Sequence, residues 1–188
     1  SEYFWLVDAL DGTKEFITGG EDFTVNIALI YQGEPVMGVV YVPVSEDMYA
    51  GYITKEGDKR AIRWTPDRKD DKQITVRPMP AEGVTVMASA SHGDRSKLDG
   101  FLESFKVKKL MKRGSSLKIC VIAEGKADLY PRFGPTCEWD TAAGHAVLSG
   151  AGGHVVRYDN HTPLTYGKPI FENPFFIAHA PGIDLQKA

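Results

Sequence analysis

Several features that mark special classes of protein are scarce in this sequence of 188 residues. Lys and Arg number 22 against 25 Asp and Glu, so the net charge is −3 and offers no basic footprint for nucleic-acid binding. No apolar run approaches the roughly 18 residues that a membrane-spanning helix needs. The two cysteines, Cys120 and Cys137, lack CxxC spacing and are too few for a disulfide framework. We therefore expect a globular protein of a reducing cytoplasm, with no nucleic-acid partner and no membrane span.

The remaining composition is that of an ordinary globular protein, with 43% hydrophobic and 25% charged residues. The length suits one large domain or two small ones and is sufficient for a substantial core. The chain begins with Ser1 rather than methionine, and no signal-peptide pattern precedes the first apolar stretch. We expect a truncated or processed chain.

The first third of the chain favours antiparallel sheet. Apolar, β-branched segments alternate with turn signals, and QGEP at residues 32–35 is the clearest turn. The expected strands are residues 3–7, 23–31, 36–42, 47–53 and 61–64.

Strands and helices alternate in the rest of the chain. Apolar spacing predicts helices at residues 95–104, 115–124 and 141–148, and glycines follow the last two. The expected strands are residues 84–88, 105–111, 127–130, 155–158 and 175–178. This mixture predicts a layered α/β or α+β architecture.

The segment VDALDGT places Asp8 and Asp11 directly after an apolar strand. A buried carboxylate is costly unless it is paired or bound to a metal, and oxygen ligands are those that Mg²⁺ prefers. Gly12 allows close approach of the backbone, and its amide with that of Thr13 would open a short helix and face an anion. The alternative is an acidic turn in which Asp11 caps a helix.

Two downstream segments each permit a functional and a structural interpretation. EWDTAAGHAV places Asp140 at the start of a helix rich in small residues, where an acid also favours the helix dipole. RGSSLK places Ser115 as a helix cap and Lys118 near free amides, which would suit an anion. Taken alone, each segment is better explained structurally, the first as a closely packed capped helix and the second as a plain cap with a surface lysine.

SASH and YPRFGPT are less specific. Ser89 and His92 lie in a turn after a strand, where a histidine is more often structural or solvated. Arg132 could bind phosphate or pair with an acid.

The order of these five motifs is informative. The order D-x-x-D-G-T, S-x-S-H, G-S-S-L-K, Y-P-R-F-G-P-T and W-D-T-A-A-G resembles the magnesium-dependent, lithium-sensitive phosphatase superfamily that contains inositol monophosphatase, and within it the CysQ-type 3'(2'),5'-bisphosphate nucleotidases. The resemblance runs from LVDALDGTKEF to FFIAH. It implies an α+β fold, a layered αβαβα sandwich that here lacks its N-terminal helices and first hairpin. Residues 1–82 would belong to an antiparallel-sheet lobe and 83–188 to an α/β lobe, with the active site between them.

The resemblance also implies roles for individual residues. Asp8, Asp11, Asp140 and the carbonyl of Leu10 would bind metal. Thr13, with Asp11, would act in catalysis by orienting the attacking water. The residues expected to bind substrate are Gly12, Thr13, Ser89, His92, Gly114, Lys118, Arg132 and Asp140.

The implied activity is hydrolysis of 3'(2')-phosphoadenosine 5'-phosphate to AMP and phosphate in sulfur-assimilation recycling. It would use two or three Mg²⁺ ions and be inhibited by Li⁺, in a cytoplasmic monomer or homodimer, with a peripheral position at a bacterial inner membrane left open. The alternatives are an inositol or sugar monophosphatase and a catalytically incomplete nucleotide-binding fragment.

Two departures from the family pattern bear on activity. Ala9 stands where the family usually has proline. Relatives also carry, upstream, a metal-binding glutamate and an acidic partner for the threonine, and Glu2 is a poor substitute. We expect low activity of this chain, with apolar surface exposed on Tyr3–Val7 and on the helix from Thr141.

Overall fold

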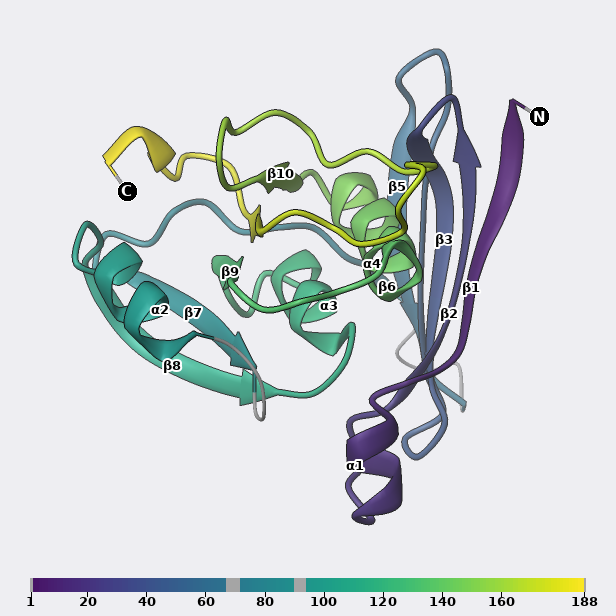
Figure 1. The fold of residues 1–188 in the computed structure, drawn as a ribbon, viewed down its shortest axis with the longest axis horizontal. Helices are drawn as coiled ribbons and strands as arrows, with labels where there is room; N and C mark the ends of the chain where they lie inside the picture. The colour runs from purple at the N-terminus through teal and green to yellow at the C-terminus, as the bar shows by residue number, and fades with distance from the viewer. Residues whose placement is uncertain (1, 67–71, 90–93, 188) are drawn as a thin grey trace.

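Two β-sheets with helices between them form the main layers of this computed structural model, which describes residues 2–66, 72–89 and 94–187 (Figure 1). The strands are β1 (Tyr3–Asp11), β2 (Thr24–Tyr31), β3 (Glu34–Val42), β4 (Asp47–Ile53), β5 (Lys59–Trp64), β6 (Lys72–Gln73), β7 (Val84–Ser89), β8 (Val107–Arg113), β9 (Leu129–Arg132), β10 (His154–Arg157) and β11 (Phe176–His179). The helices are α1 (Thr13–Ile17), α2 (Arg95–Leu102), α3 (Leu117–Ala123), α4 (Glu138–Gly150) and a 3₁₀ turn, η1 (Leu185–Lys187).

The first sheet is antiparallel, with its strands in the sequence order β1-β2-β3-β4-β5-β6. Its hairpins follow from local turn chemistry. Gln32 and Gly33 both have positive φ, 50° and 86°, which matches the twist of a two-residue hairpin between β2 and β3. The QGEP turn expected from the sequence is therefore confirmed.

The second sheet is mixed, in the order β10-β11-β9-β7-β8, and β7 runs parallel to both β8 and β9. Side chains on the two faces of β7 pack into two different hydrophobic cores. Met87 joins the large core with α3 and α4, whereas Val84 and Val86 pack with Phe101 of α2. The layers are thus sheet, helices, sheet and helix, which confirms the expected α+β sandwich. Among the described residues, no helix is long and apolar enough to cross a membrane.

Helix α4 lies unusually close to the first sheet. Gly38 of β3 and Gly51 of β4 are cross-strand partners, and a Cβ at Gly51 would lie 2.6 Å from the Cα of Val147. Only hydrogen at these two positions leaves room for the α4 backbone. The small residues expected to permit close packing of this helix do so, and the contact fixes the position of its first turn.

Some element boundaries differ from expectation. β1 continues to Asp11, beyond the expected end at Val7, because an irregularity lets it stay paired with β2. Helix α3 begins after Ser116, and Ser115 has a left-handed φ of 42°. The expectation that Ser115 caps this helix was therefore wrong. The short strand β6 was not predicted.

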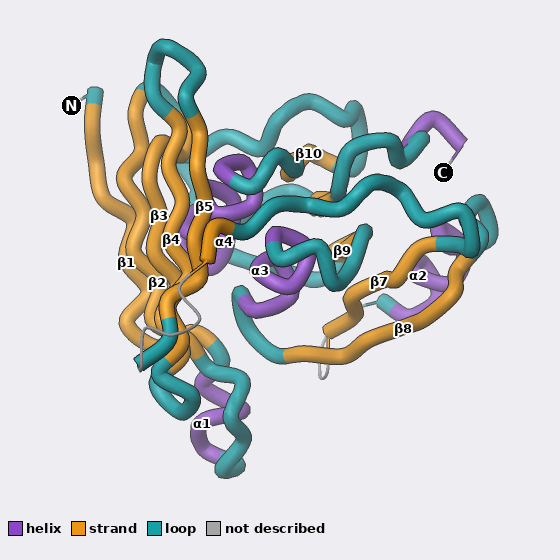
Figure 2. The backbone as a smooth tube through the Cα atoms, turned by 180° about the vertical axis from the view of Figure 1, so that it is seen from behind, coloured by secondary structure: helices purple, strands orange, loops and turns teal. Residues whose placement is uncertain are grey.

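The outer face of the first sheet is apolar and open. Tyr3, Trp5 and Val7 of the edge strand β1 are 45%, 55% and 54% exposed. Helices α3 and α4 both lie on the opposite side of this sheet (Figure 2). Exposure of Tyr3–Val7 is thus confirmed, but the expected exposure of α4 was wrong, because its residues from Thr141 to Leu148 are buried between the two sheets.

Candidate active site

Three carboxylates from two distant segments converge. Asp8 pairs with Asn26 and Asp11 with Thr24, so β1 contains one residue more than β2 over this interval. Residues three apart in a regular strand point to opposite faces, and the extra residue of a β-bulge resets that alternation. Asp8, Asp11 and Asp140 each offer a ligand oxygen, and these oxygens all lie within 4.8 Å of one another.

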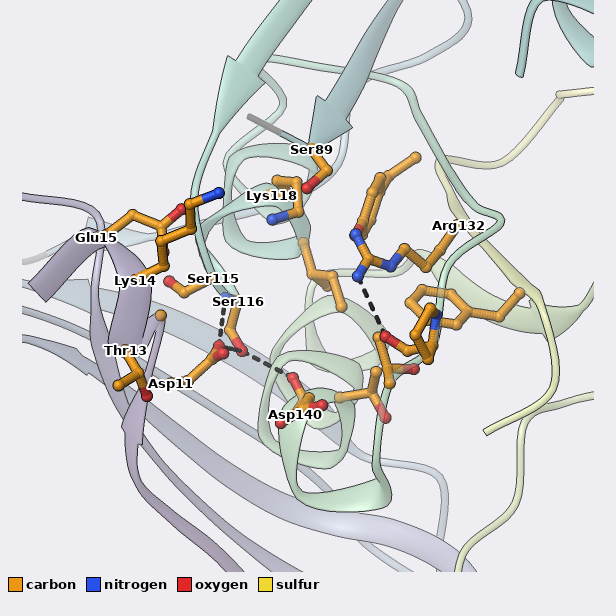
Figure 3. Close-up of a pocket in the computed structure, with 17 residues that line it drawn as sticks. Asp11, Thr13, Lys14, Glu15, Ser89, Ser115, Ser116, Lys118, Arg132 and Asp140 are labelled. Atoms are coloured by element: carbon orange, nitrogen blue, oxygen red, sulfur yellow. Dashed lines mark hydrogen bonds between the residues drawn. The ribbon is translucent and has the colours of Figure 1, made fainter. Parts of the chain in front are cut away.

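Asp11 is held by donors from neighbouring elements. Its Oδ2 accepts hydrogen bonds from the backbone N–H of Ser116 at 2.9 Å and from the Ser116 hydroxyl at 3.0 Å (Figure 3). It also accepts from Nδ2 of Asn26 at 3.3 Å. Burial raises the pKa of the Asp11 carboxyl, the Ser116 hydrogen bond opposes that rise, and nearby Asp8 adds to it. A cation would relieve both the burial and the repulsion.

Asp140 belongs to the first turn of α4. Its Oδ2 accepts a hydrogen bond of 2.7 Å from the N–H of Cys137, the residue that caps the helix. Burial raises the pKa of Asp140 to about 6, and the Asp11 and Asp8 carboxylates contribute to the increase. The structural interpretation of this acid is confirmed, because one oxygen accepts from the residue that caps the helix, and the same group also lies close to the other two acids.

A cavity of about 240 Å³ adjoins the carboxylates. Its lining includes Lys14, Lys118 and Arg132, so basic side chains face Asp11 and Asp140 across it (Figure 3). Lys118 is almost fully buried, and this burial lowers the pKa of its ammonium group to about 8. The Lys118 Nζ lies 5.4 Å from the ring centroid of Tyr130 and donates to the carbonyl of Arg113 at 3.3 Å. The cavity could therefore hold a cation beside the carboxylates and an anion beside the basic side chains at the same time.

The remaining predicted residues divide into three groups. Gly12, Thr13 and Ser89 line the cavity, and the Thr13 hydroxyl donates to the Leu10 carbonyl at 3.3 Å. Gly114 is not among the cavity-lining residues in the described part of the chain. Its N–H donates instead to Asp22 at 2.8 Å. The prediction for His92 lies outside the described residues.

Sequence reasoning missed two buried polar residues at the centre of the site. Ser116 and Asn26 contact each other, with Nδ2 of Asn26 donating to the Ser116 hydroxyl at 2.8 Å. Asn26 lies in the apolar strand FTVNIALIY, where an isolated amide was the only available signal. Ser116 was overlooked because its neighbour Ser115 fitted the helix-cap pattern.

The donor set matches a hard divalent cation. Mg²⁺ binds oxygen ligands at about 2.1 Å and is usually held by few carboxylates together with water and substrate phosphate. The site supplies carboxylate oxygens from Asp8, Asp11 and Asp140 without a sulfur or imidazole ligand among the grouped residues. Mg²⁺ therefore fits the residues present.

The sequence profile described as "Inositol monophosphatase family" matches residues 1–180. This chain belongs to the inositol monophosphatase family. The family assignment agrees with the order of motifs, and the predicted resemblance is confirmed.

Comparison with curated proteins shows which members of the family this chain resembles. The chain is 48% identical to "3'(2'),5'-bisphosphate nucleotidase CysQ" of Salmonella typhimurium over 173 residues, and 48% identical to the protein of that name from Escherichia coli K12 over 174. Both alignments cover 92% of this chain and 66% of the relative. The chain thus spans slightly less than two thirds of the length of these relatives.

Solved structures show the same relationship. The crystal structure of CysQ from Bacteroides thetaiotaomicron superposes with a TM-score of 0.84 at 37% identity, covering 95% of this chain and 70% of the other. An inositol monophosphatase from Anabaena shares the fold, with a TM-score of 0.74 at 24% identity over 95% of this chain and 67% of the other.

Proposed function

We propose that this chain carries the metal and nucleotide site of a Mg²⁺-dependent 3'(2'),5'-bisphosphate nucleotidase. The observation that carries the proposal is the convergence of Asp8, Asp11 and Asp140 beside a cavity with buried Lys118 on its other side. The names of the curated relatives favour a nucleotide bisphosphate as substrate. A cytoplasmic location and a role in sulfur-assimilation recycling stay predictions.

The reaction we propose is hydrolysis of a phosphomonoester by water. Bound Mg²⁺ would lower the pKa of a water molecule and neutralise charge on the phosphate and the leaving oxygen. Asp8, Asp11 and Asp140, with the Leu10 carbonyl, would hold the cation. The Thr13 hydroxyl would orient the water, and the amides that begin α1 would contact the scissile phosphate. Positioning and charge neutralisation account for most of the rate in such a mechanism.

The basic half of the cavity would select the substrate. A bisphosphate nucleotide carries a second phosphate that remains after hydrolysis, and a buried ammonium group binds such an anion more strongly than an exposed one does. Lys118 and Arg132 are placed to receive it, and Ser89 would contact the nucleotide. An inositol monophosphate lacks this second phosphate, so the charge distribution favours the nucleotide.

Release of inorganic phosphate tests the proposal. The 188-residue chain and the E. coli relative would be assayed at equal concentration with 3'-phosphoadenosine 5'-phosphate and with inositol 1-phosphate, each with Mg²⁺, with EDTA, and with Mg²⁺ plus Li⁺. We expect Mg²⁺-dependent, Li⁺-inhibited release that is faster from the nucleotide. The E. coli relative serves as the reference for this assay. Faster release from inositol 1-phosphate would contradict the proposed substrate.

A second candidate is nucleotide binding with no turnover. It is favoured by buried Lys118 and by Arg132 in the cavity lining, because binding a nucleotide phosphate needs no activated water. Calorimetry distinguishes the candidates, because a binding module would bind 3'-phosphoadenosine 5'-phosphate tightly while releasing no phosphate.

A further inference from the structure

Ser116 contacts three elements of the carboxylate site at once. Its backbone N–H and hydroxyl both reach Oδ2 of Asp11, its hydroxyl oxygen accepts from Asn26, and the same hydroxyl lies 2.9 Å from the carbonyl oxygen of Asp140. Ser116 is only 3% exposed and Asn26 only 1%. A buried hydroxyl with this many partners restrains each of them.

These contacts divide the Asp11 carboxylate into two unlike oxygens. Within the described part of the chain, all hydrogen bonds that reach this carboxylate end on Oδ2, from Ser116, Asn26 and, at 3.5 Å, the Thr24 hydroxyl. Oδ2 therefore has little remaining capacity for a cation, because a carboxylate oxygen has two lone pairs. Oδ1 accepts none of these hydrogen bonds and is therefore the oxygen left to bind a cation.

The contact between the Ser116 hydroxyl and Asp140 limits the distance between two of the acids, whereas the contacts with Asp11 orient one carboxylate. Asp11 lies on β1 and Asp140 on α4, and these residues are far apart in sequence. The Ser116 hydroxyl, which has one proton to donate, lies within hydrogen-bond distance of Oδ2 of the first and of the main-chain carbonyl of the second. It thus sets how far the end of β1 can move from the first turn of α4.

We propose that Ser116 is a positioning residue that directs Oδ1 of Asp11 toward the cation and holds Asp11 and Asp140 close enough to share it. The inference rests on the cation site of the proposed function, but not on the identity of the substrate. Groups that hydrogen-bond to metal ligands and fix their orientation commonly change metal affinity by roughly 10–100-fold when they are removed.

The test measures Mg²⁺ affinity by isothermal titration calorimetry in the full 188-residue chain. The variants are Ser116→Ala, which removes the hydroxyl, Ser116→Thr, which keeps it, and the control Ser149→Ala on the same helix as Asp140 but outside the carboxylate site. Circular dichroism confirms that each variant is folded. We expect at least a tenfold loss of Mg²⁺ affinity in S116A, recovery to within about threefold of wild type in S116T, and no change in S149A.

Nuclear magnetic resonance on the wild-type chain gives a second readout that needs no folded variant. The Ser116 N–H donates to a carboxylate that would bind the cation, so its amide resonance should shift as Mg²⁺ is added, with the calorimetric midpoint. The Ser149 amide should not shift. A folded S116A with wild-type affinity, an equal loss in S149A, or a Ser116 resonance that does not respond to Mg²⁺ would overturn the proposal.

The two proposals fail in different ways. If the wild-type chain hydrolyses no nucleotide but S116A loses Mg²⁺ affinity, the proposed function is wrong and the role of Ser116 stands. If the nucleotide is hydrolysed and S116A binds Mg²⁺ like the wild type, the role of Ser116 is wrong and the proposed function stands.

Discussion

A Cβ atom at Gly38 would lie 2.5 Å from the carbonyl oxygen of Ala143, so β3 and α4 meet backbone to backbone. Helix α4 therefore has little freedom to move away from the first sheet. Since Asp140 lies in the first turn of this helix, the contact at Gly38 also positions a carboxylate of the candidate site.

Gly38→Ala should destabilise the protein. Neither backbone can move without disturbing the sheet or the helix, and overpacking of this kind typically costs about 1–3 kcal/mol. Urea unfolding would show a loss of this size, with weaker Mg²⁺ binding as α4 shifts. The control is Gly100→Ala in α2, where an added Cβ would have no other part of the described chain within 4 Å outside its own helix turn, and the change should stabilise by about 0.5–1 kcal/mol. Equal stability of G38A and wild type would contradict the packing argument.

Asp140→Asn should stabilise the cation-free protein above pH 6. The folded-state pKa of Asp140 is raised from 3.8 to about 6, so the folded protein binds this proton more tightly than the unfolded chain does. The cost of the charged group is therefore fully present above pH 6 and falls as pH decreases toward 3.8. The asparagine oxygen can still accept from the Cys137 N–H.

Thermal unfolding with EDTA tests this sign. D140N should have a higher melting temperature than wild type at pH 8, and the difference should shrink at pH 4.5. Added Mg²⁺ should raise the melting temperature of wild type much more than that of D140N. A lower melting temperature for cation-free D140N at pH 8 would show that the charged Asp140 carboxylate does not destabilise the folded protein.

Lys118→Met should weaken nucleotide binding without weakening Mg²⁺ binding. Methionine keeps most of the buried stem and removes the charge, and a hydrogen bond to a charged group contributes about 1.5–3 kcal/mol, or roughly 10–100-fold in affinity. Calorimetry with 3'-phosphoadenosine 5'-phosphate measures the loss, and Lys126→Met at an exposed lysine is the control. An equal loss for inositol 1-phosphate would argue against a nucleotide-specific role.

The triple change Tyr3→Thr, Trp5→Thr and Val7→Thr should reduce aggregation. The three residues form an exposed apolar stripe along an edge strand, and such a stripe promotes association. Threonine keeps the preference for β-structure. Binding of the dye anilinonaphthalene sulfonate and light scattering should both fall, whereas Ile170→Thr, at a residue 73% exposed elsewhere, should change them little. Unchanged dye binding in the triple variant would show that this face does not dominate the apolar surface.

Residue patterns predicted most elements because local signals and packing agree in them. The strand FTVNIALIY and the small-residue helix EWDTAAGHAV were both recognisable, and the latter led to Asp140. The convergence of Asp8, Asp11 and Asp140 followed from the resemblance, since nothing local links Asp140 to β1.

The parts that could not be predicted depend on tertiary geometry. The β-bulge between Asp8 and Asp11 has no distinctive residue type, and only the register with β2 reveals it. Ser115 and Ser116 are identical in type, so only the left-handed backbone of Ser115 determines which one reaches Asp11. Gly114 was assigned to substrate by its motif, but its N–H is engaged by Asp22, from a segment far away in sequence.

The most direct test of the cation and nucleotide site is a crystal structure with Mn²⁺ in place of Mg²⁺ and with 3'-phosphoadenosine 5'-phosphate. The account predicts an anomalous difference peak about 2.1–2.2 Å from oxygens of Asp8, Asp11 and Asp140, with a phosphate of the nucleotide beside it and the other phosphate near Lys118. A peak elsewhere, or a nucleotide bound with no cation between its phosphate and these three carboxylates, would contradict it.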